Sequence, residues 1–140
     1  MAEVKRTVER PLSPHIGIYR WPITLVMSIV HRITGGALYF GTLLLAAWLV
    51  AAAMGPREFA FVNGLFAHPL GLLVLLGYTW ALIHHMLGGV RHLIWDTGQA
   101  LDIKSADALA WLTIIASVIT TAVVWAAALS MRGLALKDLL

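Results

Sequence analysis

Three long stretches of this 140-residue chain contain no Asp, Glu, Lys or Arg. They cover residues 33–56, 59–90 and 108–131. A helix that crosses a lipid bilayer needs about 20 largely apolar residues, so each stretch is long enough to span one. The sequence therefore predicts an all-α fold, an integral membrane bundle of three transmembrane helices.

The composition supports this fold class. Hydrophobic residues make up 60% of the chain and charged residues only 12%, which lies far outside the range of a soluble domain. The chain has no cysteine, so disulfides and thiolate metal sites are excluded, and histidine is the best candidate ligand for any metal or haem. The net charge of +3 is modest and its positive residues are spread along the chain, so we expect no nucleic-acid partner.

The chain is expected to form one membrane-anchor domain, residues 1–140. It begins with a basic arm, residues 1–20, in which Pro11 and Pro14 oppose helix formation by removing backbone donors. We expect this arm to lie extended at the membrane surface. The three predicted helices cover about 22–54, 69–95 and 108–131.

Two polar segments are expected to connect these helices. Gly55-Pro56 ends the first helix, and the segment to about residue 68 is predicted to be a loop and surface piece. In the second connection, 97–107, Ser105 or Asp107 could cap the third helix by accepting its first free N–H groups.

The distribution of positive charge predicts the topology. Of the ten Lys and Arg residues, seven lie in the arm, at the start of the first helix and around the second connection, and three lie in the first loop and the C-terminal tail. The positive-inside rule places the side with more positive charge, and therefore the N-terminus, on the cytoplasmic or matrix side of the membrane. Ser28, Arg32 and Arg91 are expected at that same side.

The second helix carries one stripe of histidine and glycine. His85, Gly88, Gly89 and His92 share a face because spacings of three, four and seven residues are close to whole helical turns. The two glycines would leave a groove beside His85, in which a flat macrocycle could lie while the imidazole reaches its iron. The same residues also fit close helix packing around a hydrogen-bonded interhelical histidine, and both interpretations remain open.

The depth of His85 suits a haem. It lies six residues before Arg91, which places the ring ~9 Å inward from the charged end of the helix at ~1.5 Å per residue. His31, Arg91 and His92 are candidate partners for the propionates, because a carboxylate at membrane depth needs cationic or donor neighbours. For Arg91 and His92, snorkelling to the interface is the alternative.

His84 is a second histidine beside this site. It points about 100° away from His85, so the two cannot ligate one iron from a regular helix, and His84 is expected to pack against other helices or a subunit. No other histidine of the chain is at a comparable depth on a facing helix. A bis-histidine site would therefore need its second ligand from another polypeptide.

Ser28 and Arg32 form a separate polar pair one turn apart on the first helix. Their hydroxyl and guanidinium groups could bind the carbonyl of a quinone, with Arg32 stabilising negative charge as the quinone is reduced. The alternative is a helix end anchored by a snorkelling Arg32, with Ser28 bonded to its own backbone.

These residues lie within three motifs that together resemble a known family. The motifs are Arg10-Pro11-Leu12-Ser13-Pro14-His15, then Ser28-Ile29-Val30-His31-Arg32-Ile33-Thr34-Gly35, and then His85 through Gly89-Val90-Arg91-His92 to Asp96. In order and spacing they resemble the cytochrome b-type large membrane-anchor subunit of succinate dehydrogenase, respiratory complex II. The resemblance covers most of the chain.

The resemblance implies a subunit of an oxidoreductase complex that does not itself carry the succinate-oxidising site. Haem b would be shared with a second small membrane-anchor subunit, with His85 as one axial ligand and a histidine of that subunit as the other. An iron-sulfur subunit and a flavoprotein subunit would dock on the anchor and pass electrons to ubiquinone at Ser28 and Arg32. His31, Arg91 and His92 would be the haem-propionate neighbourhood, and the membrane would be a bacterial or mitochondrial inner membrane.

Other functions remain as alternatives. The chain could be a haem-free structural anchor of a soluble dehydrogenase, or the anchor of a fumarate reductase. A transporter subunit with a histidine proton relay is disfavoured, because the predicted spans contain no acidic residue.

Overall fold

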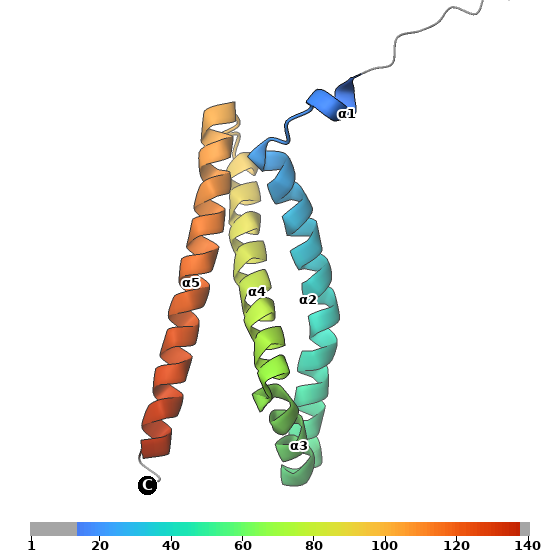
Figure 1. Cartoon of the computed structure of the whole chain (residues 1–140), viewed down its shortest axis with the longest axis vertical. Helices are drawn as coiled ribbons and strands as arrows, with labels where there is room; N and C mark the ends of the chain where they lie inside the picture. Colours follow the sequence, from blue (N-terminus) through green and yellow to red (C-terminus); the bar gives the residue numbers. More distant parts are fainter. Residues whose placement is uncertain (1–13, 138–140) are drawn as a thin grey trace, which may run out of the picture.

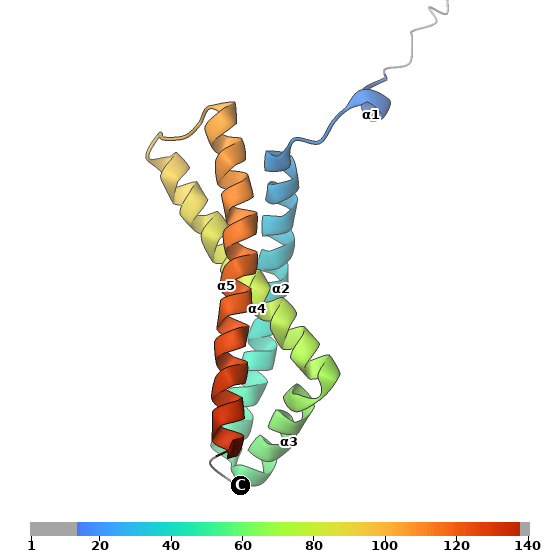
Figure 2. The ribbon, with the colours of Figure 1, turned by 60° about the vertical axis from the view of Figure 1, so that its left-hand side comes forward.

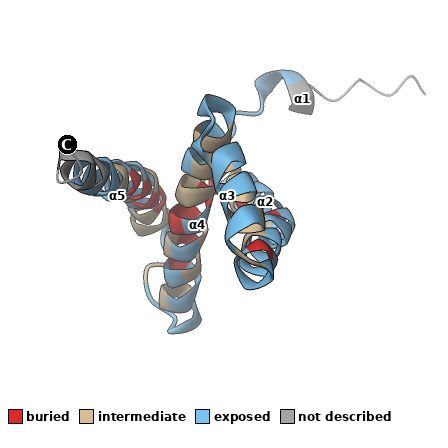
Figure 3. Cartoon of the chain, turned by 90° about the horizontal axis from the view of Figure 1, so that it is seen from below, coloured by how far each residue is buried: buried red, intermediate tan, exposed pale blue. Residues whose placement is uncertain are grey.

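The computed structural model describes residues 14–137, which form five helices. These are α1 (His15–Ile18), α2 (Ile23–Met54), α3 (Pro56–Ala67), α4 (Pro69–Asp96) and α5 (Ile103–Lys137). The long helices α2, α4 and α5 alternate in direction and form an elongated bundle (Figure 1). Seen from below, α4 lies between α2 and α5 (Figure 3). The described residues contain no strand, and the predicted all-α membrane bundle is confirmed.

The three long helices are built to cross a bilayer. Each is long and apolar enough to do so, and the shortest of them, α4, has 28 residues. At ~1.5 Å per residue that length is ~42 Å, which exceeds the ~30 Å hydrocarbon core of a membrane. Large apolar side chains point outward from all three, among them Leu43, Leu73, Leu82, Val118 and Val123. The chain is a multi-pass membrane protein.

The N-terminal arm is described only from residue 14. Its residues 1–13, including Pro11, lie outside the described part of the chain. The short helix α1 follows Pro14 and lies away from the bundle, to which residues 19–22 lead back (Figure 1). The expectation of a wholly extended arm is therefore wrong at α1.

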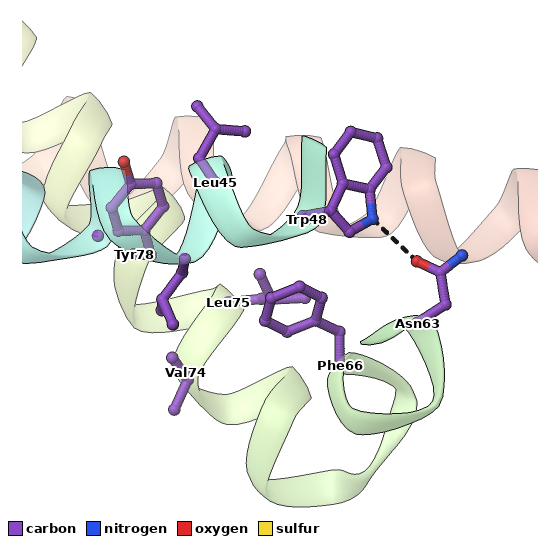
Figure 4. Close-up of a pocket in the computed structure, with 9 residues that line it drawn as sticks. Leu45, Trp48, Asn63, Phe66, Val74, Leu75 and Tyr78 are labelled. Atoms are coloured by element: carbon purple, nitrogen blue, oxygen red, sulfur yellow. Dashed lines mark hydrogen bonds between the residues drawn. The ribbon is translucent and has the colours of Figure 1, made fainter. Parts of the chain in front are cut away.

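The prediction of a loop after the first helix is also wrong, because most of that segment forms the helix α3. Gly55 has φ 141°, a backbone conformation that glycine adopts readily, and Pro56 then occupies the first position of α3, where its missing N–H costs nothing. The Trp48 indole N–H donates a 2.9 Å hydrogen bond to the Asn63 side-chain oxygen and ties α3 to α2 (Figure 4). A largely apolar cavity of about 310 Å³ lies between α2, α3 and α4 beside this bond.

The second connection is shorter than expected, because α5 begins at Ile103. Asp102 precedes it, and the Asp102 carboxylate accepts a 3.0 Å hydrogen bond from the backbone N–H of Ser105. This bond lowers the pKa of Asp102. Asp102 is therefore the cap, and the predicted capping by Ser105 or Asp107 is wrong. The apolar pattern placed the helix start too late because the first turn of α5 is polar.

α4 crosses its two neighbours obliquely, so close contact is concentrated where the helices meet (Figure 2). On α2, Gly41 faces the ring of Tyr78, and a Cβ at Gly41 would collide with that ring. The absence of a side chain therefore sets the approach of α2 to α4, as small residues do in membrane helix packing. The buried apolar side chains of the described residues are small or unbranched for the most part, and include Met27, Ala81, Ile83 and Ala110.

We expect Gly41→Leu to weaken the bundle, because the new side chain must displace Tyr78. Overpacking of this kind costs about 1–3 kcal/mol. Gly36→Leu is the matched control on the same helix, since no described atom outside its own helix lies within 4 Å of a Cβ placed there. Denaturation of the purified protein in detergent should show a loss of stability for Gly41→Leu alone. Equal effects of both substitutions would contradict this packing role.

Candidate functional site

Three imidazole rings gather where α2 meets α4. The rings of His31 and His85 are stacked, with centroids 4.0 Å apart and planes 16° from parallel. His92 meets the His31 ring edge-on at 5.3 Å. The structure therefore brings together three residues that the sequence had singled out on two different predicted helices.

The orientation of His85 is fixed through its Nδ1 atom. This atom lies 3.1 Å from the backbone oxygen of His31 and 3.3 Å from the hydroxyl oxygen of Thr34. A carbonyl oxygen can only accept a hydrogen bond, so Nδ1 must carry the proton. The lone pair of the neutral ring then lies on Nε2. A histidine that binds a metal through Nε2 has this tautomer, and its Nδ1–H is usually donated to an acceptor, as it is here.

Two glycines allow the helices to approach at this point. A Cβ on Gly35 would lie 2.9 Å from Cε1 of His85, and a Cβ on Gly88 would collide with the His31 ring. The space at Gly88 is thus filled by His31 and is not an open groove, which corrects part of the expected glycine groove. At Gly89 no described atom of another helix lies within 4 Å of a Cβ position, so only this part of the predicted groove remains open.

His84 has a different environment from its neighbour His85. It is 1% exposed, and its Nδ1 lies 3.1 Å from the hydroxyl oxygen of Ser117 on α5. Ser117 donates its only hydroxyl proton to the carbonyl of Ile114 at 2.8 Å, so it accepts from the Nδ1–H of His84. The Nε2 of His84 is enclosed by protein. The expected packing role of His84 is confirmed, because the ring lies inside the α4 and α5 interface.

Arg91 is buried at the same face of α4 as His84, seven residues away. Only 4% of Arg91 is exposed, and its guanidinium packs over the Trp95 ring at 5.1 Å. Its Nε and Nη1 atoms have no hydrogen-bond partner among the described residues, and it forms no ion pair there with Asp96. A buried cation without a partner is costly, so this group calls for an anion.

The structure therefore separates Arg91 from the stacked imidazole rings. Arg91 lines a cavity of about 210 Å³ between α4 and α5, whereas His31 and His92 lie on the α2 side. Like the two guanidinium nitrogens of Arg91, the Nε2 atom of His31 is buried without a hydrogen-bond partner in the described part of the chain. Nε2 of His84 is buried without a partner in the same way.

Ser28 and Arg32 lie one turn apart on α2, on either side of His31 in the sequence. Ser28 is partly buried and Arg32 is exposed. Thr34 and Thr79 each bond to the carbonyl one turn before them, whereas Ser28 makes no such bond among the described residues. Among the described residues neither Ser28 nor Arg32 has a side-chain hydrogen bond, and no contact joins them to the imidazole cluster.

Sequence reasoning missed two residues of the site, Thr34 and Ser117. Thr34 stands three residues after His31, a spacing that places both on one helix face, and this was an available signal. No such signal marked Ser117, because its contact with His84 depends on how α4 packs against α5. Within the described residues no cluster of three or more metal-ligating side chains exists, so a metal here would need a macrocycle or another chain to complete its ligands.

These features define a class, an integral membrane helix bundle with a histidine cluster between two of its spans. The family model for the succinate dehydrogenase/fumarate reductase transmembrane subunit matches residues 6–124. The chain belongs to this family, which confirms the predicted resemblance and the prediction of a membrane subunit of an oxidoreductase complex.

Named relatives agree with this assignment. The succinate dehydrogenase cytochrome b556 subunit of Paracoccus denitrificans is 44% identical over 124 residues, covering 86% of this chain and 95% of the relative. That of Rickettsia felis is 34% identical over 127 residues, covering 89% and 99%. The mitochondrial succinate dehydrogenase cytochrome b560 subunit of Bos taurus is 40% identical over 119 residues, covering 80% and 70%.

We expect Ser117→Ala to destabilise the bundle by about 1–3 kcal/mol, because the buried Nδ1–H of His84 loses its acceptor. Ser130→Ala is the matched control, since Ser130 also lies on α5 and donates to a carbonyl three residues back, but is exposed. Denaturation in detergent compares the two variants. Equal losses of stability in Ser130→Ala and Ser117→Ala would show that the hydrogen bond from His84 to Ser117 makes no specific contribution to stability.

Proposed function

We propose that this chain is the haem b-containing membrane-anchor subunit of succinate dehydrogenase. In this role it helps to pass electrons from the iron-sulfur subunit to ubiquinone and forms part of the quinone site. The observation that carries the proposal is the state of His85, whose Nδ1–H is held by the His31 carbonyl while Nε2 keeps its lone pair. The family and the cytochrome b names of the relatives support it.

His85 would be the axial ligand that this chain contributes. His84 is unsuited because its Nε2 is enclosed, whereas Nε2 of His85 is not among the enclosed polar atoms. A bound haem b would supply a one-electron redox centre. The second axial histidine would come from the second small anchor subunit, because the His31 ring is stacked on His85 and the His92 ring contacts His31.

The propionates would be held by His31, Arg91 and His92. The Arg91 guanidinium has buried nitrogen atoms without partners and would donate to a carboxylate, as Nε2 of His31 would in the tautomer that carries its proton there. This need also disfavours a haem-free structural anchor, which would leave those groups unpaired unless a partner subunit supplied acceptors.

Ser28 and Arg32 would bind ubiquinone. The Ser28 hydroxyl and the Arg32 guanidinium can donate hydrogen bonds to a quinone carbonyl, and Arg32 stays protonated while negative charge develops on that oxygen. Their position at the first turns of α2 would place the quinone near the membrane boundary. Protons for the reduced quinone would then be available from the aqueous side.

The whole chain, residues 1–140, would act as a single anchor domain in a bacterial or mitochondrial inner membrane. The excess of Lys and Arg in the N-terminal arm, near the start of α2 and around the connection between α4 and α5 supports an N-terminus on the cytoplasmic or matrix side. The iron-sulfur and flavoprotein subunits would dock on that side. Because the family description covers both enzymes, an anchor of fumarate reductase is the second candidate.

Replacing His85 tests the haem assignment. We expect His85→Asn in the assembled complex to abolish the b-type spectrum of the reduced haem, because asparagine is a poor iron ligand. His84→Asn is the matched control, since its side-chain amide can still donate to Ser117. An unchanged reduced spectrum for His85→Asn would overturn the ligand assignment.

Replacing Arg32 tests the quinone site. We expect Arg32→Leu to lower succinate–quinone activity about 10-fold to 150-fold, the loss that follows removal of a charge-assisted hydrogen bond worth about 1.5–3 kcal/mol. Succinate oxidation with a soluble artificial acceptor should be unchanged. Arg57→Leu, at the opposite end of the bundle on α3, is the control. Undiminished quinone activity in a normally assembled Arg32→Leu complex would contradict the assignment.

A further inference from the structure

Thr34 is a buried hydroxyl at the contact between α2 and α4, with only 2% of the residue exposed. Its Oγ1 atom lies 3.0 Å from the carbonyl oxygens of both Val30 and His31. It also lies 3.3 Å from Nδ1 of His85. Four described threonines bond through their hydroxyl groups to the carbonyl four residues back: Thr34, Thr79, Thr113 and Thr121. Of these four threonines, only Thr34 also contacts a histidine.

The direction of these hydrogen bonds follows from proton counting. The Thr34 hydroxyl has one proton, and its two carbonyl neighbours can only accept, so that proton points to Val30 or His31. Nδ1 of His85 faces the His31 carbonyl, so it must donate. Its N–H is therefore shared between the His31 carbonyl and the lone pairs of the Thr34 hydroxyl.

The same turn of α2 also shapes the space around the His85 ring. The His31 ring covers one face of it, and Gly35, next to Thr34, leaves room for its Cε1 edge. With that face and the Nδ1 edge both held, rotation of the imidazole about its Cβ–Cγ bond is restricted. The direction of the Nε2 lone pair is restricted with it.

We propose that Thr34 is a positioning residue for His85. By accepting part of the Nδ1–H bond it fixes the ring angle and increases the electron density on Nε2, the atom that would bind iron. The inference rests on the proposed function, because it assigns Thr34 to the same ligand. Outer-shell partners of ligating histidines typically change metal affinity 10-fold to 100-fold when they are removed.

The test compares three variants in the assembled complex. Thr34→Val keeps the side-chain shape and removes the acceptor, whereas Thr34→Ser restores an acceptor. Thr121→Val is the matched control, because Thr121 is also buried and also bonds to the carbonyl one turn back, on α5. Two properties are measured, the rate of haem transfer to excess apomyoglobin and the midpoint potential of the haem in a redox titration.

We expect Thr34→Val to transfer haem about 10-fold faster than the unmodified complex. Its midpoint potential should rise, because a less electron-rich imidazole favours the reduced iron. Thr34→Ser should return both properties toward their original values, and Thr121→Val should leave both unchanged. If Thr34→Val does not assemble, Thr34→Ala carries the same expectation.

Two results would overturn the inference. One is a Thr34→Val complex with unchanged haem transfer and potential, and the other is an equal change in Thr34→Val, Thr34→Ser and Thr121→Val. Failure of the proposed function looks different, because then the unmodified complex holds no haem or His85→Asn keeps its spectrum. If His85→Asn loses the reduced haem spectrum but Thr34→Val changes neither haem transfer nor midpoint potential, only the role of Thr34 is rejected.

Discussion

The hydrogen bond from His85 Nδ1–H to the backbone carbonyl of His31 both orients the His85 ring and connects α4 to α2. It can form only if α2 and α4 approach closely, which Gly35 and Gly88 permit at the histidines and Gly41 permits further along α2. Polar groups at membrane depth have no water to bind, so an imidazole there must find a partner in the protein. The same contact therefore satisfies His85 and holds the two helices in register.

The polar groups of the bundle fall into two classes. Some are satisfied within the chain, as the Nδ1 of His84 is by Ser117. Others, such as the guanidinium of Arg91 and Nε2 of His31, lie buried without a partner in the described residues. The satisfied groups hold α4 to its neighbours, whereas the unsatisfied nitrogens, which also include Nε2 of His84, have no such role within the described residues.

The sequence predicted much of this architecture because charge-free runs report membrane spans directly. It also placed His85, His92 and Arg91 correctly on α4, since helical periodicity alone fixes the angles between them. It failed at α3, where Gly55-Pro56 was interpreted as the start of a loop although proline begins a helix there. It could not show that His31 fills the space at Gly88, because that depends on the distance between two helices, and single-sequence patterns do not carry that information.

α4 presents adjacent histidines to two different neighbours, and its register is correspondingly strict. His84 reaches the Ser117 hydroxyl on α5, while His85, one residue later, reaches a backbone carbonyl on α2. If the N-terminal end of α4 stayed in place, inserting or deleting one residue before His84 would rotate both histidines by about 100° around the helix axis. One imidazole would then lie at the position of the other, and the second would have neither acceptor. A one-residue change of length there would therefore cost the bundle at least one of these two hydrogen bonds.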